Sequence, residues 1–420
     1  MLYGARRRLP FSLFLTRFIM LLRTLSFLLG ATALSAATFS IEGAVDRALR
    51  SNPDLAAARW TIEEARGRVL QSGRRSNPEL EVELKPNVRG RGEFSFSAGF
   101  MQKYPVTNRL WLERAISEAE LRAASAEVAN AERLLAAEVR SGAVKILALK
   151  AQRELKQSQR RNSLELAEAA AKTAKTGEGS ALEAAQFELE ARQLSLELLQ
   201  ADAEIAAQTG ALRPLLGVPA AQNVSISGDL PAPSTVSGGA SPANRADYRA
   251  ATEKETAARI AVEAAHKGRW EDAGFGMVAE VERANDAPDG RETDGFIGFK
   301  FSLPLPFWNR NEGKVHEAAA TAEKAGKQRE ALAQHIRSEA EAARAEMEAA
   351  ARIVTEASGP LLAKARELEE SFRKAKESGQ ATAAEVLRAR EKRLSLEAAR
   401  LSALRDYHLA RVRLLAAQGR

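Results

Sequence analysis

The sequence contains one series of motifs twice, about two hundred residues apart. Residues 102–109 end in Asn-Arg after a proline, and residues 302–311 repeat that arrangement. A glycine turn at 176–183 returns at 378–385. The spacing between equivalent positions is nearly constant, with a small insertion in the second copy. A duplicated unit strongly limits the fold, because each copy must supply the same supersecondary elements.

Composition indicates long helices. Charged residues make up 28% of the chain and aromatic residues only 5%, a bias typical of coiled coils. The sequence has no cysteine, which excludes disulfides, thiolate metal sites, a cysteine nucleophile and an N-terminal lipid-modified cysteine. The four histidines are scattered without the spacing of metal ligands. We therefore expect no cofactor and no metal site.

The first 37 residues resemble a secretory signal peptide. Five arginines precede or interrupt a short apolar core, and Ser35-Ala36-Ala37 offers small residues before a cut at Thr38. A membrane anchor is the alternative, but the arginines leave the apolar stretch shorter than the roughly 20 residues of a spanning helix. Translation starts at either Met1 or Met20. The signal holds much of the excess positive charge, so a nucleic-acid partner is not indicated.

The remainder divides into a first repeat over 38–216, a linker rich in Pro, Gly and Ser over 217–243, and a second repeat over 244–420. Each repeat begins with a helical pattern, at 41–73 and at 247–267. Two short alternating segments follow, at 80–85 and 93–102 and again at 274–282 and 295–303. The second pair is separated by a longer predicted turn, which includes 283–290 and accounts for the insertion.

The alternating segments have the pattern of transmembrane β-strands. In 93–101 the phenylalanines fall on one face, and in 295–303 most large apolar residues do the same. Their length suits the roughly 9–11 residues that a tilted strand needs to cross a bilayer. A soluble hairpin packed on a helix is the alternative. Four strands cannot close a barrel, and lipid does not tolerate an open edge, so membrane insertion would require several chains.

Two proline turns lead from strand to helix. Pro105 and Asn108 follow the first hairpin, and Pro304, Pro306 and Asn309 follow the second. Proline ends a ladder because it lacks an amide, and we expect the asparagines to cap the helices that follow.

Long helices are predicted over 108–175 and 311–377, each followed by a return helix, over 180–216 and 382–417. Alanine-rich faces such as 115–126 permit close helix packing. Charged residues on these helices either face solvent, form pairs or line a water-filled interior. No motif of a hydrolase or nucleotide-binding enzyme is present, so we expect no enzyme.

These motifs together resemble the TolC-like outer-membrane efflux proteins, and are most similar to the CusC/CzcC-type branch of heavy-metal and cation efflux. The resemblance rests on residues 52–55, 76–80 and 303–313 and on the glycine turns, and it covers 38–420. Two features depart from that branch: the missing N-terminal cysteine and the form of the first proline turn.

The resemblance implies an α+β membrane protein, a homotrimer in which four strands per chain build one 12-stranded β-barrel continuous with a long α-helical coiled-coil periplasmic tunnel. Residues 217–243 would lie at the equator of the tunnel. The expected location is the outer membrane, in contact with its lipid, and the protein would not be lipidated. Partners would be a periplasmic adaptor and an inner-membrane pump of RND type.

By the same resemblance, the glycine turns lie at the periplasmic tip and dock the adaptor. The docking residues would be Gly177, Gly179, Ser180, Gly379 and Thr382. A ring of acids at the aperture would comprise Glu178, Glu183, Glu377 and Glu385. The expected function is a passive exit duct for an efflux pump, with metal cations among the candidate substrates. The alternative is a soluble periplasmic coiled-coil adaptor or structural protein.

Overall fold

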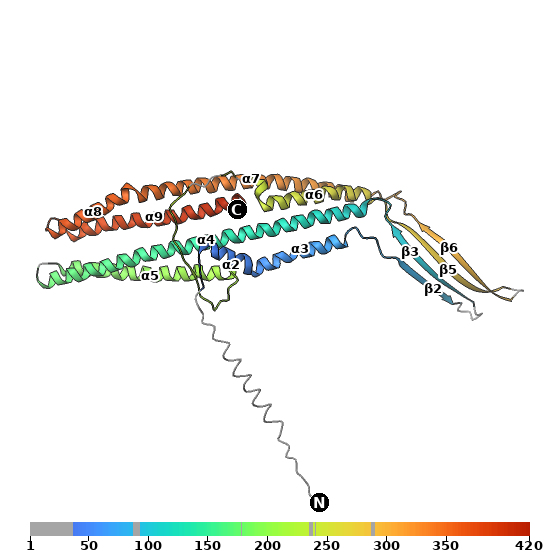
Figure 1. Cartoon of the computed structure of the whole chain (residues 1–420), viewed down its shortest axis with the longest axis horizontal. Helices are drawn as coiled ribbons and strands as arrows, with labels where there is room; N and C mark the ends of the chain where they lie inside the picture. Colours follow the sequence, from blue (N-terminus) through green and yellow to red (C-terminus); the bar gives the residue numbers. More distant parts are fainter. Residues whose placement is uncertain (1–36, 87–92, 178, 235–237, 240, 287–289) are drawn as a thin grey trace, which may run out of the picture.

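The chain is elongated, with a body of long helices, a sheet at one end and two helical turns at the other (Figure 1). The computed structural model describes residues 37–86, 93–177, 179–234, 238–239, 241–286 and 290–420. All but the last residue of the predicted signal peptide lie outside these ranges. None of the described helices has an apolar stretch long enough to cross a bilayer.

The first repeat opens with two helices where the sequence predicted one. Helix α2 spans Ile41–Ser51 and α3 spans Pro53–Gln71. Between them, Asn52 is extended because a residue that precedes proline avoids the helical region. The Asn52 side chain then caps α3, its Oδ1 accepting the amide of Leu55 at 2.8 Å.

Helix α4 spans Arg109–Lys175, and its 67 residues extend about 100 Å. Helix α5, Ala181–Leu215, returns beside it. The predicted small-residue seam is confirmed, because Ala119, Ala123 and Ala124 are all buried. Alanines at these positions let neighbouring helices approach closely.

The second repeat contains α6 (Ala246–Lys267), α7 (Glu312–Ser358), α8 (Pro360–Glu377) and α9 (Ala383–Ala417). The helix predicted over 311–377 is broken at Gly359. Proline lacks the amide that would continue the α7 ladder, so Pro360 instead starts a new helix. The first repeat has no such break at the corresponding level of α4.

The linker between the repeats packs against the first of them. Strand β4 (Val224–Ile226) pairs in parallel with β1 (Ala37–Phe39), and a short helix, η1, spans Pro242–Asn244. Val218, Val224 and Ile226 are buried in one cluster with side chains of α2 and α4. The linker therefore helps to form the core of the first repeat.

Four antiparallel strands form the sheet: β2 (Glu79–Pro86), β3 (Phe94–Tyr104), β5 (Ala273–Asp286) and β6 (Gly290–Ser302). Their order is β2-β3-β5-β6, so β3 and β5 join the two hairpins. The predicted long turn at 283–290 is wrong, since β5 continues to Asp286, which lies opposite Gly290. Antiparallel pairing extends these polar residues, and the insertion lengthens the strands instead of the turn.

Candidate functional site

One face of the sheet is apolar across all four strands. The register aligns Leu80, Phe100, Met277 and Phe299 in one row. The next row holds Val82, Ala98, Ala279 and Ile297. Most of these side chains are exposed, and Ile297 keeps 78% of its surface accessible. A contiguous apolar face of this kind marks a surface that binds lipid or another protein.

The opposite face is predominantly polar. It carries Glu79, Glu81 and Glu83 on β2, Glu280 and Glu282 on β5, and Asp294 and Lys300 on β6. Three lysines form ion pairs here: Lys103 with Glu79 at 2.7 Å, Lys85 with Glu83 at 2.9 Å and Lys300 with Glu81 at 3.8 Å. One apolar and one polar face fit a sheet placed between lipid and water.

The polar face is concave. Lys300 on β6 lies 3.8 Å from Glu81 on β2, although β3 and β5 separate these two strands. The intervening positions on β3 and β5 include Gly99 and Gly276, which have no side chain above the sheet. The sheet therefore curves around its polar side, as the wall of a barrel does.

Both outer strands lack a partner within the described chain. Strand β2 pairs only with β3, and β6 pairs only with β5. Each edge exposes backbone groups that require hydrogen bonds in an apolar solvent. The sheet is thus incomplete as a membrane structure until further strands join it.

The predicted proline turns lie between sheet and helices, but the predicted caps are wrong. Asn108 precedes α4 without a side-chain capping hydrogen bond. The amide of Arg109 instead reaches the Thr107 hydroxyl at 3.4 Å. Pro105 precedes these residues in the same connection.

In the second repeat, Pro304, Pro306 and Asn309 follow β6, and Asn311 takes the capping position of α7. Asn311 adopts a left-handed conformation with φ of 65°, and its side chain donates to the carbonyl of Ala265 at 2.7 Å. Asn309 accepts the Asn311 amide at 3.0 Å, so it stabilises the turn before the helix.

The two glycine turns lie together at the other end of the molecule. Gly177 and Gly379 have φ of 81° and 74°, a conformation that favours glycine. Thr382 and Glu385 form a capping box at the start of α9, whereas Ser180 makes no side-chain cap for α5. Gly179 packs closely, since an added Cβ would meet the Thr173 hydroxyl oxygen at 2.5 Å.

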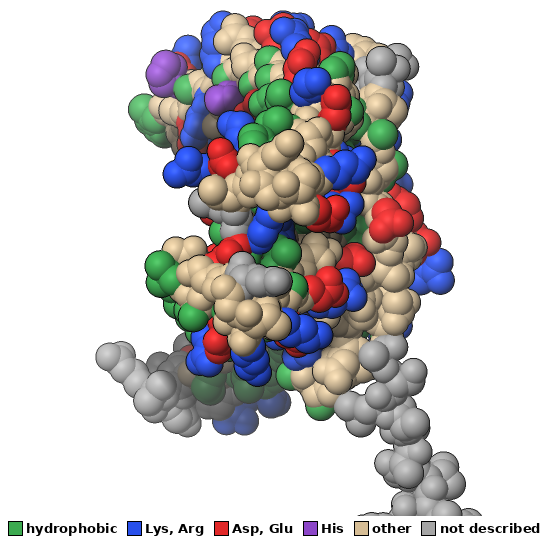
Figure 2. Space-filling model, turned by 90° about the vertical axis from the view of Figure 1, so that its left-hand side faces the viewer, with side chains coloured by type: hydrophobic (Ala, Val, Ile, Leu, Met, Phe, Trp, Pro, Cys, Tyr) green, Lys and Arg blue, Asp and Glu red, His purple; other side chains and the backbone are tan. Residues whose placement is uncertain are grey.

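The predicted aperture acids have partners within the chain. Glu183 pairs with Lys376 at 2.6 Å, and Glu377 lies 3.6 Å from Arg373. Hydrogen bonds from the backbone and side chain of Thr382 lower the pKa of Glu385. Glu178 lies outside the described residues. Figure 2, which views this end, shows acidic and basic side chains intermingled over it.

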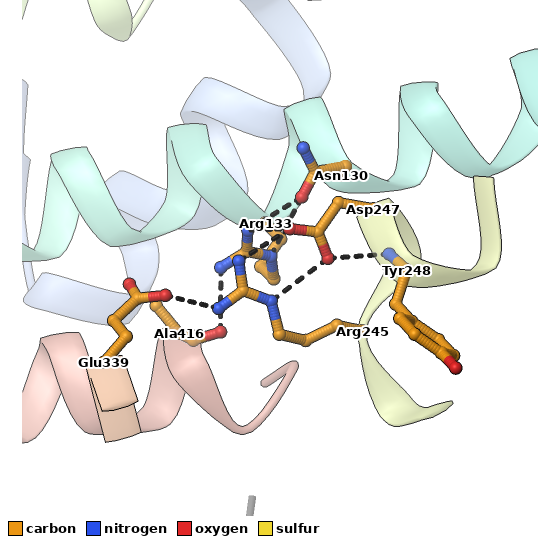
Figure 3. A network of polar contacts seen from close by, with 7 residues as sticks. All are labelled: Asn130, Arg133, Arg245, Asp247, Tyr248, Glu339 and Ala416. Atoms are coloured by element: carbon orange, nitrogen blue, oxygen red, sulfur yellow. Dashed lines mark hydrogen bonds and ion pairs between the residues drawn. The ribbon is translucent and has the colours of Figure 1, made fainter. Parts of the chain in front are cut away.

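A buried polar network joins the repeats near the middle of the body (Figure 3). Arg245, at the start of α6, is only 6% exposed and binds both carboxylate oxygens of Asp247, at 3.0 and 2.6 Å. Its remaining terminal nitrogen donates to Glu339 on α7. Arg133 on α4 donates to the carbonyl of Ala416 at 2.7 Å.

Electrostatics in this network favour the charged forms of its central pair. Burial disfavours both charges, but the hydrogen bonds to Asp247 and Glu339 outweigh it and raise the pKa of Arg245. Likewise, burial is outweighed by the Arg245 guanidinium, which lowers the pKa of Asp247. Burial and the charge of Arg245 lower the pKa of Arg133. Sequence patterns did not single out Arg245, because Glu339, its partner on α7, comes from a distant segment.

The described residues include no group of three or more His, Asp or Glu side chains placed to hold a metal ion. Polar side chains of the described residues gather on two surfaces, the concave face of the sheet and the end of the molecule that carries the two glycine turns. A curved amphipathic sheet with two open edges, continued by long helical hairpins, defines a subunit of an assembled barrel-and-tunnel channel.

Comparison with known proteins supports that class. Residues 44–218 match the family described as outer membrane efflux protein. Curated protein sequences give no match.

Solved structures share the fold over nearly the whole chain. CusC has a TM-score of 0.73 and 18% identity, covering 90% of this chain and 92% of its own. The outer-membrane channel OprN has a TM-score of 0.72 and 16% identity, covering 90% of this chain and 89% of its own. The outer membrane protein VceC from Vibrio cholerae has a TM-score of 0.70 and 20% identity, covering 90% of this chain and 96% of its own. At these identities the similarity establishes the fold.

Proposed function

We propose that the protein is the outer-membrane exit duct of a tripartite efflux system. It passively conducts substrates from an inner-membrane pump and a periplasmic adaptor to the outside. The observation that carries the proposal is the four-stranded sheet, apolar on one face, polar and concave on the other, and unpaired at both edges. The alternative, a soluble coiled-coil adaptor, fits less well, because an exposed apolar sheet face is unfavourable in water.

Three copies supply the missing strands. If β6 of each chain pairs with β2 of the next, three four-stranded sheets make a barrel of twelve strands, within the range of outer-membrane barrels. The apolar faces then meet lipid and the polar faces line the pore. The helical hairpins extend this pore into the periplasm as a coiled-coil tunnel.

Metal cations are the proposed cargo, and an RND-type pump is the proposed energy source. The sequence resemblance of residues 52–55, 76–80 and 303–313 is the ground for proposing this branch. The polar face also supports it, because its acids outnumber its lysines, and a lining of that sign attracts cations into a pore. The duct is non-catalytic in this proposal and needs no cofactor.

We place the adaptor at the tip. Gly177, Gly179 and Ser180 of one turn and Gly379 and Thr382 of the other form its docking surface, and contact there opens the tunnel. The signal peptide of residues 1–37 directs export, and without a cysteine the mature chain carries no N-terminal lipid.

Fractionation and mass measurement test the proposal. The protein should stay in the outer-membrane fraction until detergent is added, and the solubilised particle should contain three chains. A chain that is soluble without detergent would support the adaptor alternative, and a detergent-solubilised monomer would contradict the trimeric duct.

A further inference from the structure

A basic pocket lies where the sheet joins the helices. Its volume is about 330 Å³, and its lining residues are Thr107, His266, Lys267, Arg269 and Trp270. Thr107 belongs to the connection from β3 to α4, and the other four lie at the end of α6 and in its connection to β5. The pocket is therefore level with the helix-proximal end of the apolar face.

The basic side chains of this pocket have no ion-pair partner among the described residues. The lining contains no acid, and neither Lys267 nor Arg269 forms an ion pair with another described residue. Arg109, at the same junction, differs in this respect, because it contacts both Glu113 and Asp272, the latter at 2.9 Å. A cationic pocket with a hydroxyl and an indole matches a phosphate group in charge and in hydrogen-bond donors.

The basic pocket is distinct from the cavity on the polar face of the sheet, because the two share only one lining residue. A larger cavity of about 640 Å³ on the polar side is lined by Lys103, Gly274 and Ser302, which belong to that face. Trp270 lines both cavities, and the other four residues of the basic pocket line only their own. Trp270 is therefore shared by the polar cavity and the basic pocket.

Exposed aromatic side chains surround the same level of the molecule. Trp308 is 96% exposed, and Phe307 contacts it edge to face at 6.3 Å between ring centres. At the end of the apolar face, the guanidinium of Arg75 lies 5.5 Å from the ring centre of Tyr104. Aromatic rings with neighbouring cations are typical of the interface between hydrocarbon and headgroups.

The repeat places a second basic connection at the equivalent position. Gly73-Arg74 follows α3 as Gly268-Arg269 follows α6. Basic residues therefore occur at both helix-to-strand connections of each chain, next to the apolar face.

We propose that the pocket of Thr107, His266, Lys267, Arg269 and Trp270 binds the phosphate headgroup of an anionic phospholipid at the periplasmic rim of the barrel. The proposal rests on the membrane insertion argued above. Lys267 and Arg269 supply charge-assisted hydrogen bonds, and Trp270 lies at headgroup depth. The acyl chains then run along the apolar face that begins at Tyr104.

The test uses the full-length protein in detergent, mixed with phosphatidylethanolamine alone or with added phosphatidylglycerol, and native mass spectrometry of the retained lipids. Wild type should retain phosphatidylglycerol preferentially. Lys267→Gln with Arg269→Gln should weaken that retention about 25-fold, since each basic residue near a surface contributes on the order of a fivefold effect. Lys267→Arg with Arg269→Lys keeps the charge and should keep the lipid.

A matched control is Lys324→Gln with Arg352→Gln, which removes the same charge from exposed positions on α7. Equal loss of phosphatidylglycerol in this control would overturn the site, as would unchanged retention in the pocket variant. Insertion into vesicles of phosphatidylethanolamine alone is scored separately. If wild type inserts but shows no anionic preference, the lipid site fails while the duct stands; if it inserts into no vesicle, both fail.

Discussion

Lys376 on α8 donates a hydrogen bond to Glu183 on α5 at 2.6 Å, and its ammonium lies 5.7 Å from the ring centre of Phe187. This contact connects the helical hairpin of one repeat to that of the other beside the glycine turns. Phe187 is 1% exposed, so the ion pair borders a packed apolar side chain. The two hairpins are therefore fastened together at the end where the proposed tunnel opens.

Removal of this contact should loosen the tip. Lys376→Gln keeps the size of the side chain but removes the charge that meets Glu183. A partly exposed ion pair stabilises by roughly 0.2–1 kcal/mol, which corresponds to an increase in open-state population of up to about fivefold. Single-channel recording in planar bilayers would measure that population.

Arg192→Gln is the control for this substitution. Arg192 pairs with Glu188 one turn away on α5, so its loss separates no hairpins. An equal rise in open-state population for both variants would show that general surface charge, and not the Lys376 contact, restrains the tip.

Opposite faces of one strand should respond differently to the same substitution. Ile297 belongs to the apolar face, whereas its neighbour Phe296 belongs to the opposite face, in the row of Glu83 and Glu280. Ile297→Lys should destabilise the inserted barrel by about 2–4 kcal/mol, because lysine then faces hydrocarbon. Phe296→Lys should be tolerated far better. Urea titration of refolded protein in vesicles measures both, and equal effects would refute the assignment of faces.

Neutralising Asp247 should weaken the joint between the repeats. Asp247→Asn leaves the buried Arg245 guanidinium with only Glu339 as an ionised partner, at a cost of about 3 kcal/mol. Thermal unfolding monitored by circular dichroism would report the change. Asp202→Asn, which removes an exposed partner of Arg153, should have a much smaller effect.

The same residue predicts a dependence on pH. The pKa of Asp247 is lower in the folded chain than its ordinary value of 3.8. Its stabilising contribution is therefore complete above pH 3.8 and is lost as the pH falls through the lower, folded-state value. In the Asp247→Asn variant the free energy of unfolding should therefore fall less steeply as the pH decreases through that range. An unchanged slope would contradict this assignment.

Two glycines with free space around them should respond with opposite signs. An added Cβ meets nothing within 4 Å at either Gly177 or Gly210. Gly177 has positive φ, so Gly177→Ala should destabilise by about 1 kcal/mol. Gly210 lies inside α5, so Gly210→Ala should stabilise by up to about 1 kcal/mol. Chemical denaturation compares the two, and a shared sign would disprove the backbone argument.

Local patterns were sufficient to predict most elements of this fold. Alternation in 93–102 predicted β3 to within two residues at either end, since side-chain period follows directly from strand geometry. The limits of β5 were wrong because Asn285 and Asp286, typical turn residues, are held extended by pairing with β6. The predicted caps at Asn108 and Asn309 were wrong for a related reason. The backbone of each connection is fixed by other hydrogen bonds, from the Arg109 amide to Thr107 in the first and from the Asn311 amide to Asn309 in the second.

The buried polar network around Arg245 could not be predicted from local sequence. Nothing in the sequence around Arg245 distinguishes it from the many arginines on helix surfaces. The network around it includes Arg133 and Glu339, which lie roughly a hundred residues before and after it along the chain. Asn52 combines a local and a distant contact. Its capping of α3 belongs to the local sequence Asn52-Pro53-Asp54, whereas the hydrogen bond from its side chain to the carbonyl of Leu215, at 3.1 Å, depends on the fold.

Strand length differs between the hairpins: β5 and β6 have 14 and 13 residues, whereas β2 and β3 have 8 and 11. In the proposed ring of three chains, the two kinds of hairpin would alternate around the barrel. The hydrogen-bonded ladder of β5 and β6 continues past Arg283, the residue opposite Phe94 at the end of β3, as far as Asp286 and Gly290. The described wall of such a barrel would therefore extend farther from the helices at three places than between them, with threefold symmetry.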